Sequence, residues 1–106
     1  KKDYTEALKW FKKSAELGNT YAQNMVGYIY DYGQGVKVDY DIAYSWYRKA
    51  AEKGDAEAQY NLGWLYYNGQ GVKKNAVTAK EWFGKAAKQG HKDAHRMDLK
   101  LFWEVR

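Results

Sequence analysis

The stretch AQYNLGWLYYNGQGV, residues 58–72, decides the fold because the near-copy AQNMVGYIYDYGQGV occupies residues 22–36. The copies begin at residues 22 and 58, so the period is 36 residues. Self-similarity at a fixed period of about 20 to 50 residues is typical of stacked repeat arrays. The sequence therefore predicts a repeat protein.

Composition narrows the class of protein. The 106 residues contain no cysteine, which excludes a disulfide framework and a thiolate metal site. The net charge is +5, and no apolar run approaches the roughly 18 residues of a membrane span. The chain begins with Lys1 rather than Met, so we expect it to be a piece of a longer array.

Working outward, apolar residues at helical spacing predict a first kind of helix, beginning near Asp3. Asp3 and Glu6 fit a capping box, and Gly18 fits the left-handed position that ends a helix. The period carries the cap to Asp39 and Asn75 and the stop to Gly54 and Gly90. These helices are expected over residues 3–17, 39–53 and 75–89.

A second kind of helix follows each stop, with Asn19 and Asp55 as expected N-caps. Gly27 and Gly63 fall in the middle of these helices, where glycine costs about 1 kcal/mol relative to alanine. We therefore expect a neighbouring helix to approach closely at each of them. These helices are expected over residues 20–32, 56–68 and 92–104.

Both ends of the array depart from the pattern. In the last helix Leu99 replaces the repeated glycine and Val105 replaces the stop, as expected of a terminal repeat that closes an array. At the other end, the first helix lacks a preceding partner, so one face of Trp10 and Phe11 is expected to be short of cover.

The chain resembles the Sel-1-like repeat family, a relative of the tetratricopeptide repeats. Its second copy carries the pattern in these residues: Ala58, Leu62, Gly63, Tyr66, Gly69, Gly71, Val72, Ala79, Trp82, Ala86, Ala87 and Gly90. Val26, Asn75 and the helix after Ala94 depart from it. The resemblance implies antiparallel helix pairs stacked in a right-handed superhelix, and scaffold or adaptor work rather than catalysis. Some family members carry disulfide-forming cysteines within each repeat, and this chain, which has no cysteine, cannot belong to that subgroup.

In the related tetratricopeptide arrays, one face of the second kind of helix lines a concave groove. By resemblance, this face supplies the candidate partner contacts, and Tyr and Trp are frequent in interface hot spots. The candidates are Tyr21, Asn24, Tyr28, Glu57, Tyr60, Trp64, Tyr67, Arg96, Lys100 and Trp103. Asp31, Tyr32, Asn68, Asp93 and Glu104 share the face. The alternative is that the rings pack between repeats and only cover the array.

The charges of this face suggest a direction for a bound peptide. Asp31 and Glu57 make one end neutral to acidic, whereas Arg96 and Lys100 make the other end basic. A peptide carboxylate is therefore expected at the basic end.

Other chemistries are disfavoured. His91 and His95 replace repeat positions held by Asn19 and Gln23, so they do not add a metal constellation, and no cofactor is expected. The Gly-Gln-Gly loops follow helices, whereas a dinucleotide fingerprint follows a strand. The lysines are mixed with glutamates, as on a solvated face, so nucleic acid is not expected as a partner. No catalytic triad can be assembled, and an enzyme is not expected.

Taken together, the sequence predicts an all-α solenoid of about two and a half repeats and six helices, forming one array over residues 1–106. The expected function is protein or peptide binding through a concave aromatic groove. The alternatives are a structural spacer without a groove ligand and end-to-end self-association through the first helix.

Overall fold

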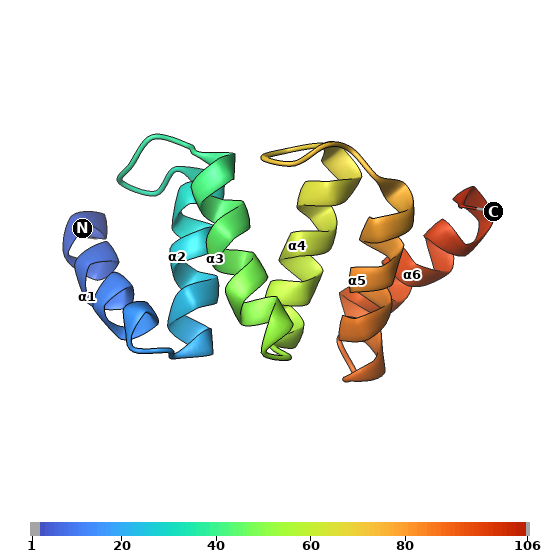
Figure 1. Cartoon of the computed structure of the whole chain (residues 1–106), viewed down its shortest axis with the longest axis horizontal. Helices are drawn as coiled ribbons and strands as arrows, with labels where there is room; N and C mark the ends of the chain where they lie inside the picture. Colours follow the sequence, from blue (N-terminus) through green and yellow to red (C-terminus); the bar gives the residue numbers. More distant parts are fainter. Residues whose placement is uncertain (1–2, 106) are drawn as a thin grey trace.

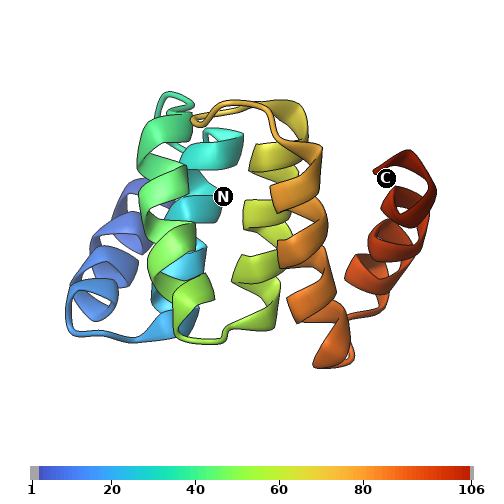
Figure 2. The ribbon, with the colours of Figure 1, turned by 45° about the vertical axis from the view of Figure 1, so that its right-hand side comes forward.

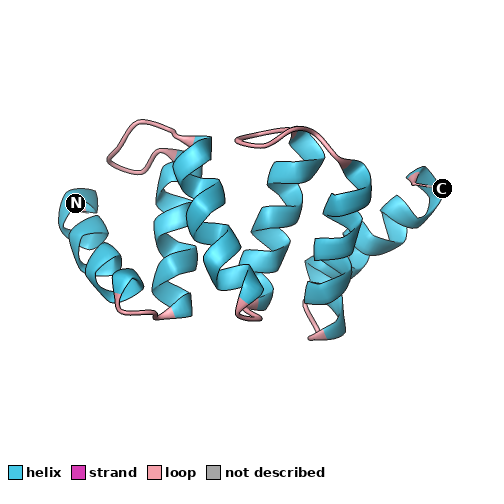
Figure 3. Ribbon diagram, in the orientation of Figure 1, coloured by secondary structure: helices cyan, strands magenta, loops and turns pink. Residues whose placement is uncertain are grey.

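The computed structural model describes residues 3–105, which form six helices and no strand (Figure 3). Helices alternate in direction along an elongated row, with the two termini at opposite ends (Figure 1). None of the described helices is long and apolar enough to cross a membrane. The helices are α1 (Tyr4–Glu16), α2 (Thr20–Tyr32), α3 (Tyr40–Glu52), α4 (Ala56–Asn68), α5 (Ala76–Lys88) and α6 (Lys92–Glu104).

Side-chain caps determine where the helices begin. In α2 and α4, Asn19 and Asp55 accept hydrogen bonds from the amides of Ala22 and Ala58. Helices α1, α3 and α5 start one residue later than expected, because the expected ranges included their N-caps and C-caps. Each such cap stabilises its helix by about 1 kcal/mol.

Only one of the two hydrogen bonds of the expected capping box forms at the start of α1. Asp3 caps the amide of Glu6 at 3.0 Å, as expected. The Glu6 carboxylate, however, accepts a hydrogen bond from the indole of Trp10 at 2.9 Å instead of reaching back to the cap. Trp10 is largely exposed, so this bond gives its uncovered ring a polar partner.

The two mid-helix glycines lie where a neighbouring helix approaches closely, as expected. A Cβ placed on Gly27 would lie 2.6 Å from Cδ1 of Tyr47, and one on Gly63 would lie 2.8 Å from Cε1 of Phe83. Tyr47 and Phe83 are both fully buried. The missing Cβ is therefore what lets α3 and α5 pack their largest core rings against α2 and α4.

Packing produces two rows of helices. Helices α2 and α4 contact each other across the repeat boundary, and α3 packs against both of them. Contacts of α3 with α1 and α5 are sparser, so α1, α3 and α5 form the outer row and α2 and α4 the inner row.

The last helix diverges from this order. Asp98 occupies the position that the buried Leu62 holds one repeat earlier, and it forms an ion pair of 3.0 Å with Lys80. The helix buries Ala94 and Leu101 but leaves Leu99 and Phe102 exposed. Figures 1 and 2 show α6 leaning away from α5. Helix α6 therefore exposes apolar side chains next to its charged ones.

Candidate partner-binding groove

The centre of the candidate groove is the inner face of α4, where Tyr60 and Trp64 lie one turn apart. Their rings meet edge to face with centroids 6.4 Å apart. Both rings also pack on the buried Phe83 of α5, at 5.7 Å for Tyr60 and 5.6 Å for Trp64. Each ring is half-buried, so it contributes to packing and still presents part of its surface to solvent. Tyr60 and Trp64 therefore pack between helices and still leave part of each ring accessible.

His91 covers the other side of Tyr60. It is the N-cap of α6, where Nδ1 accepts from the amide of Ala94 at 3.1 Å. Its ring stacks on Tyr60 at 4.4 Å, and Nε2 lies 3.1 Å from a carboxylate oxygen of Glu57. His91 therefore holds the cap position that Asn19 and Asp55 hold earlier. His95 is exposed, and no group of three possible metal ligands exists within residues 3–105.

Asn24 differs from expectation because it lies inside the interface between α2 and α4. It is only 5% exposed, and its Oδ1 accepts a hydrogen bond of 3.0 Å from Nδ2 of Asn61. The bond holds the two inner helices together, and the buried amide offers almost no surface to a ligand.

The remaining candidates on α2 are accessible. Tyr21 is largely exposed and contacts the edge of Phe11 at 6.2 Å. Tyr28 is half-buried, and its ring lies tilted against that of Tyr32 with the centroids 4.5 Å apart; Tyr32 is 62% exposed.

The expected basic end of the groove is already paired within the chain. Arg96 contacts Asp93 at 3.1 Å, and Lys100 contacts Glu104 at 3.0 Å. Tyr67 donates to Glu104 at 3.2 Å. Trp103 lies on the same helix and is 69% exposed. A peptide carboxylate would have to compete with these acidic neighbours. The charges of α6 therefore give little support to the peptide direction expected from the sequence, with a carboxylate at Arg96 and Lys100.

A pocket of about 390 Å³ opens between the C-terminal end of α2 and the face of α4 that carries Tyr60 and Trp64. It contains Tyr60 and Trp64 from the candidate set, and Asp31, Tyr32 and Asn68, which share the expected face. The lining residues that sequence reasoning left out are Tyr40, Asn61, Leu65 and Gln70. Tyr40 and Gln70 carry no local signal, because they reach the pocket only through the folding of α3 and the loop after α4.

Asp31 provides the charge of this pocket. One of its carboxylate oxygens accepts a hydrogen bond of 2.8 Å from the hydroxyl of the buried Tyr47. Partial burial raises the pKa of Asp31, and the bond from Tyr47 offsets only part of this rise. Burial, followed by the charge of Asp31, also raises the pKa of Tyr32. The carboxylate is therefore incompletely solvated and not fully compensated.

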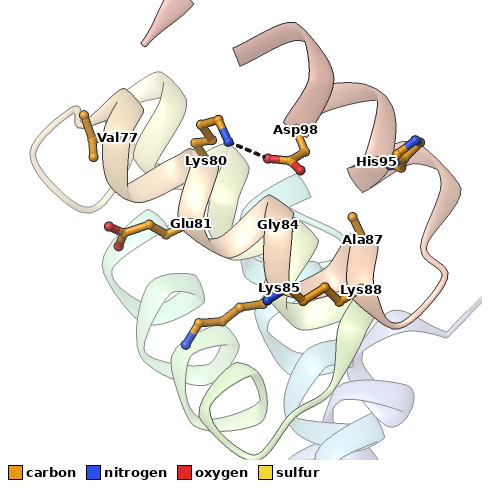
Figure 4. A pocket seen from close by; sticks show the side chains of 9 residues that line it. All are labelled: Val77, Lys80, Glu81, Gly84, Lys85, Ala87, Lys88, His95 and Asp98. Carbon is orange, nitrogen blue, oxygen red and sulfur yellow. Dashed lines mark hydrogen bonds and ion pairs between the residues drawn. The ribbon is translucent and has the colours of Figure 1, made fainter. Parts of the chain in front are cut away.

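A second pocket of about 580 Å³ lies between α5 and α6 (Figure 4). The ion pair between Lys80 and Asp98 crosses it, and Lys85 and Lys88 line it. Asp98 and Gly84 line it at the positions that Leu62 and Arg48 hold one repeat earlier. The Lys80 ammonium is paired with Asp98, the Lys85 ammonium lies 4.9 Å from the centroid of the Trp82 ring, and Lys88 is exposed, so the arrangement points to no ligand.

The chain is similar to several solved structures. A Sel1 repeat protein from Oxalobacter formigenes has 42% identity and a TM-score of 0.86, with 92% of this chain and 74% of that chain covered. The uropathogenic Escherichia coli protective antigen c5321, described as displaying an SLR fold, has 42% identity and a TM-score of 0.85, over 87% of this chain and 20% of that chain. Helicobacter pylori cysteine rich protein B has 30% identity and a TM-score of 0.83, over 91% and 72%.

A comparison with curated proteins gave no match. The Sel1 repeat, by contrast, matches residues 1–19, 20–55 and 56–91. These divisions pair α2 with α3 and α4 with α5, which are the helix pairs with the most extensive contacts. Family match, period and packing agree, and the chain belongs to the Sel1 repeat family.

Proposed function

We propose that the inner face of α2 and α4 binds an extended segment of a partner protein. The observation that carries this proposal is the pocket between the two helices, which combines aromatic rings with amide groups. Tyr21 and Tyr32 extend the aromatic surface along α2, and both are largely exposed. Aromatic side chains give large contact areas and lose few rotamers on binding.

The family supports the general role. Sel1 repeat proteins generally act as protein-interaction scaffolds and are typically non-catalytic. In this chain the scaffold is well braced, because Tyr60 and Trp64 are held by Phe83 on one side and by each other. A rigid aromatic surface reduces the entropy lost on binding. We therefore infer a binding module rather than an enzyme.

Self-association is a second candidate, and exposed apolar side chains at both ends of the array favour it. Trp10 and Leu17 are exposed on α1, and Leu99 and Phe102 on α6. Large exposed apolar residues that cluster on one surface often mark interaction sites. Under this alternative the inner face holds no ligand and the chain is a spacer between neighbours.

Site-specific photo-crosslinking distinguishes the two. A photoreactive phenylalanine analogue at Tyr32 preserves the size of the exposed ring, and the same analogue at the exposed Lys49 of α3 is the matched control on the outer row. We expect a covalent adduct with a partner from the Tyr32 position in cells of the source organism and none from Lys49. Adducts of equal yield from both positions, or adducts only between copies of this chain, would contradict the groove proposal.

A further inference from the structure

We infer that the pocket between α2 and α4 binds a positively charged side chain, arginine or lysine, of the partner segment. This inference rests on the proposed function and specifies the chemistry of the same site. It follows from the charge of the pocket, from its rings, and from a comparison of the two successive repeats.

Asp31 is the only charged residue among those lining the pocket. No ion pair to it forms within residues 3–105. Its Oδ2 is bonded to the Tyr47 hydroxyl, which leaves the other carboxylate oxygen for a ligand. A half-buried carboxylate with one free oxygen favours a cationic donor, because a charge-assisted hydrogen bond is about twice as strong as a neutral one.

The pocket walls suit the same ligand. Tyr32, Tyr60 and Trp64 contribute aromatic rings, and a cation within about 6 Å of a ring centroid is attracted by the ring quadrupole. Asn61, Asn68 and Gln70 add side-chain amides whose oxygens accept hydrogen bonds. A guanidinium or an ammonium group has several donors, so it can satisfy these oxygens and Asp31 together.

The next repeat supplies an internal comparison. Thirty-six residues later, Tyr67 stands in the place of Asp31, and Arg96 and Lys100 stand in the places of Tyr60 and Trp64. The Lys100 ammonium lies 5.6 Å from the Tyr67 ring centroid and 3.3 Å from its hydroxyl. In this repeat the chain provides its own cation. In the preceding repeat the rings and the carboxylate are present and the cation is not, which is the arrangement of a site that takes its cation from outside.

Partial burial of Asp31 agrees with this inference. The pKa of Asp31 is raised by desolvation, so its carboxylate gains more from a neighbouring cation than a fully hydrated carboxylate does. Binding of a cation should therefore strengthen as the pH rises through the pKa of Asp31.

The test uses the whole chain and small probes. N-acetyl-arginine methylamide and N-acetyl-lysine methylamide are titrated at constant ionic strength, beside the neutral citrulline and acetyl-lysine analogues. The readout is the NMR signal of the Trp64 indole N–H, assigned with Trp64→Phe. We expect saturable shifts with both cations and no saturable shift with the neutral probes.

Asp31→Asn is the decisive variant because an amide oxygen can still accept from Tyr47. We expect it to weaken cation binding about three- to tenfold, in line with a partly exposed charge pair. Glu16→Gln removes the same charge from an exposed position on α1 and should leave binding unchanged. Thermal unfolding of each variant verifies that the fold is retained.

Equal responses to the cationic and neutral probes, or unchanged binding in Asp31→Asn, would overturn the inference. A silent Trp64 with every probe would overturn it as well. Each of these three results leaves the proposed groove intact if Tyr32 still crosslinks to a partner. Loss of that crosslink contradicts the groove itself, so the two failures are distinguishable.

Discussion

Gln89 donates a hydrogen bond of 3.0 Å to the buried amide oxygen of Gln59 and a second of 2.8 Å to the carbonyl of Gly54. One repeat earlier, Lys53 occupies the position of Gln89 and reaches only the carbonyl of Gly18, at 3.2 Å. The amide oxygen of Gln23, which corresponds to Gln59, is left buried without a partner. The two repeats therefore share a fold, but this buried amide oxygen has a hydrogen-bond partner in one repeat and none in the other.

Lys53→Gln should stabilise the chain. The new amide can donate to both acceptors, and satisfying a buried polar atom is worth about 0.5–1.5 kcal/mol. The measurement is the free energy of unfolding in urea. The reciprocal change Gln89→Lys is the control and should destabilise by a similar amount, because it leaves Gln59 unpartnered. A loss of stability in Lys53→Gln would show that a lysine ammonium serves this position better.

Gly63→Ala should destabilise the chain. The new Cβ would lie 2.8 Å from the ring of Phe83, which is fully buried and has no room to move. Overpacking of this kind costs about 1–3 kcal/mol, which exceeds the gain of about 1 kcal/mol in helix propensity. Thermal and urea unfolding measure the difference.

Gly84→Ala is the matched control for that experiment. Gly84 also lies inside a helix, but a Cβ there would lie 3.6 Å from Asp98, an ordinary contact. We expect this variant to gain up to about 1 kcal/mol from helix propensity alone. If both variants were destabilised equally, close approach at Gly63 would not be the reason for its glycine.

The fold could be predicted from the sequence because the residues that mark the helix ends and the close contacts occur in both copies of the repeat. Asn19 and Asp55 occupy equivalent caps, and Gly27 and Gly63 equivalent contacts, so a weak local signal was reinforced by its copy. All-α architecture, helix ranges and close approach followed from this redundancy. The lean of α6 did not, because Asp98 replaces a core leucine only in the last unit, where no copy exists for comparison.

The candidate groove was less predictable for a physical reason. Helical spacing places residues on a face but does not say how deeply a neighbouring helix covers them. Asn24 lies on the expected face, but it is buried in the interface between α2 and α4, where it bonds to Asn61. The pocket itself depends on the separation of α2 and α4 and on Tyr40 from a third helix. Tertiary placement, which the pattern does not encode, decides which residues a ligand can reach.

Self-association should depend on the first helix if the ends mediate contact. Trp10 is 59% exposed and Leu17 is 86% exposed, so replacing both with serine removes apolar surface at little cost to the fold. In sedimentation equilibrium we expect the weight-average mass of the wild type to rise with concentration and that of the double variant to stay at 12.4 kDa. A wild type that stays at 12.4 kDa throughout would exclude end-to-end association under those conditions.

Asp31→Asn should change how stability depends on pH. Desolvation raises the pKa of Asp31 in the folded chain above its ordinary value of 3.8, so the folded state holds this proton more tightly than the unfolded state. The stabilisation that Asp31 contributes is therefore fully present below pH 3.8 and is lost as the pH rises through the raised pKa. The asparagine variant has no such proton to lose.

The difference in unfolding free energy between Asp31→Asn and wild type should consequently grow in favour of the variant from about pH 3.8 upward and then level off. Urea unfolding of both proteins at a series of pH values from about 3 to 8 measures this difference, because this range brackets the ordinary pKa values of carboxyl groups. The contributions of the other carboxyl groups are the same in both proteins and cancel in the difference. A constant difference would mean that Tyr47 compensates Asp31 fully. A cationic ligand should oppose this trend, because the wild type binds it more tightly than the variant does and gains more stability from it at high pH. If the wild type becomes more stable than the variant only when the arginine probe is present, the cost of the uncompensated Asp31 carboxylate is offset by the bound cation. That result would connect the carboxylate to the function of the pocket.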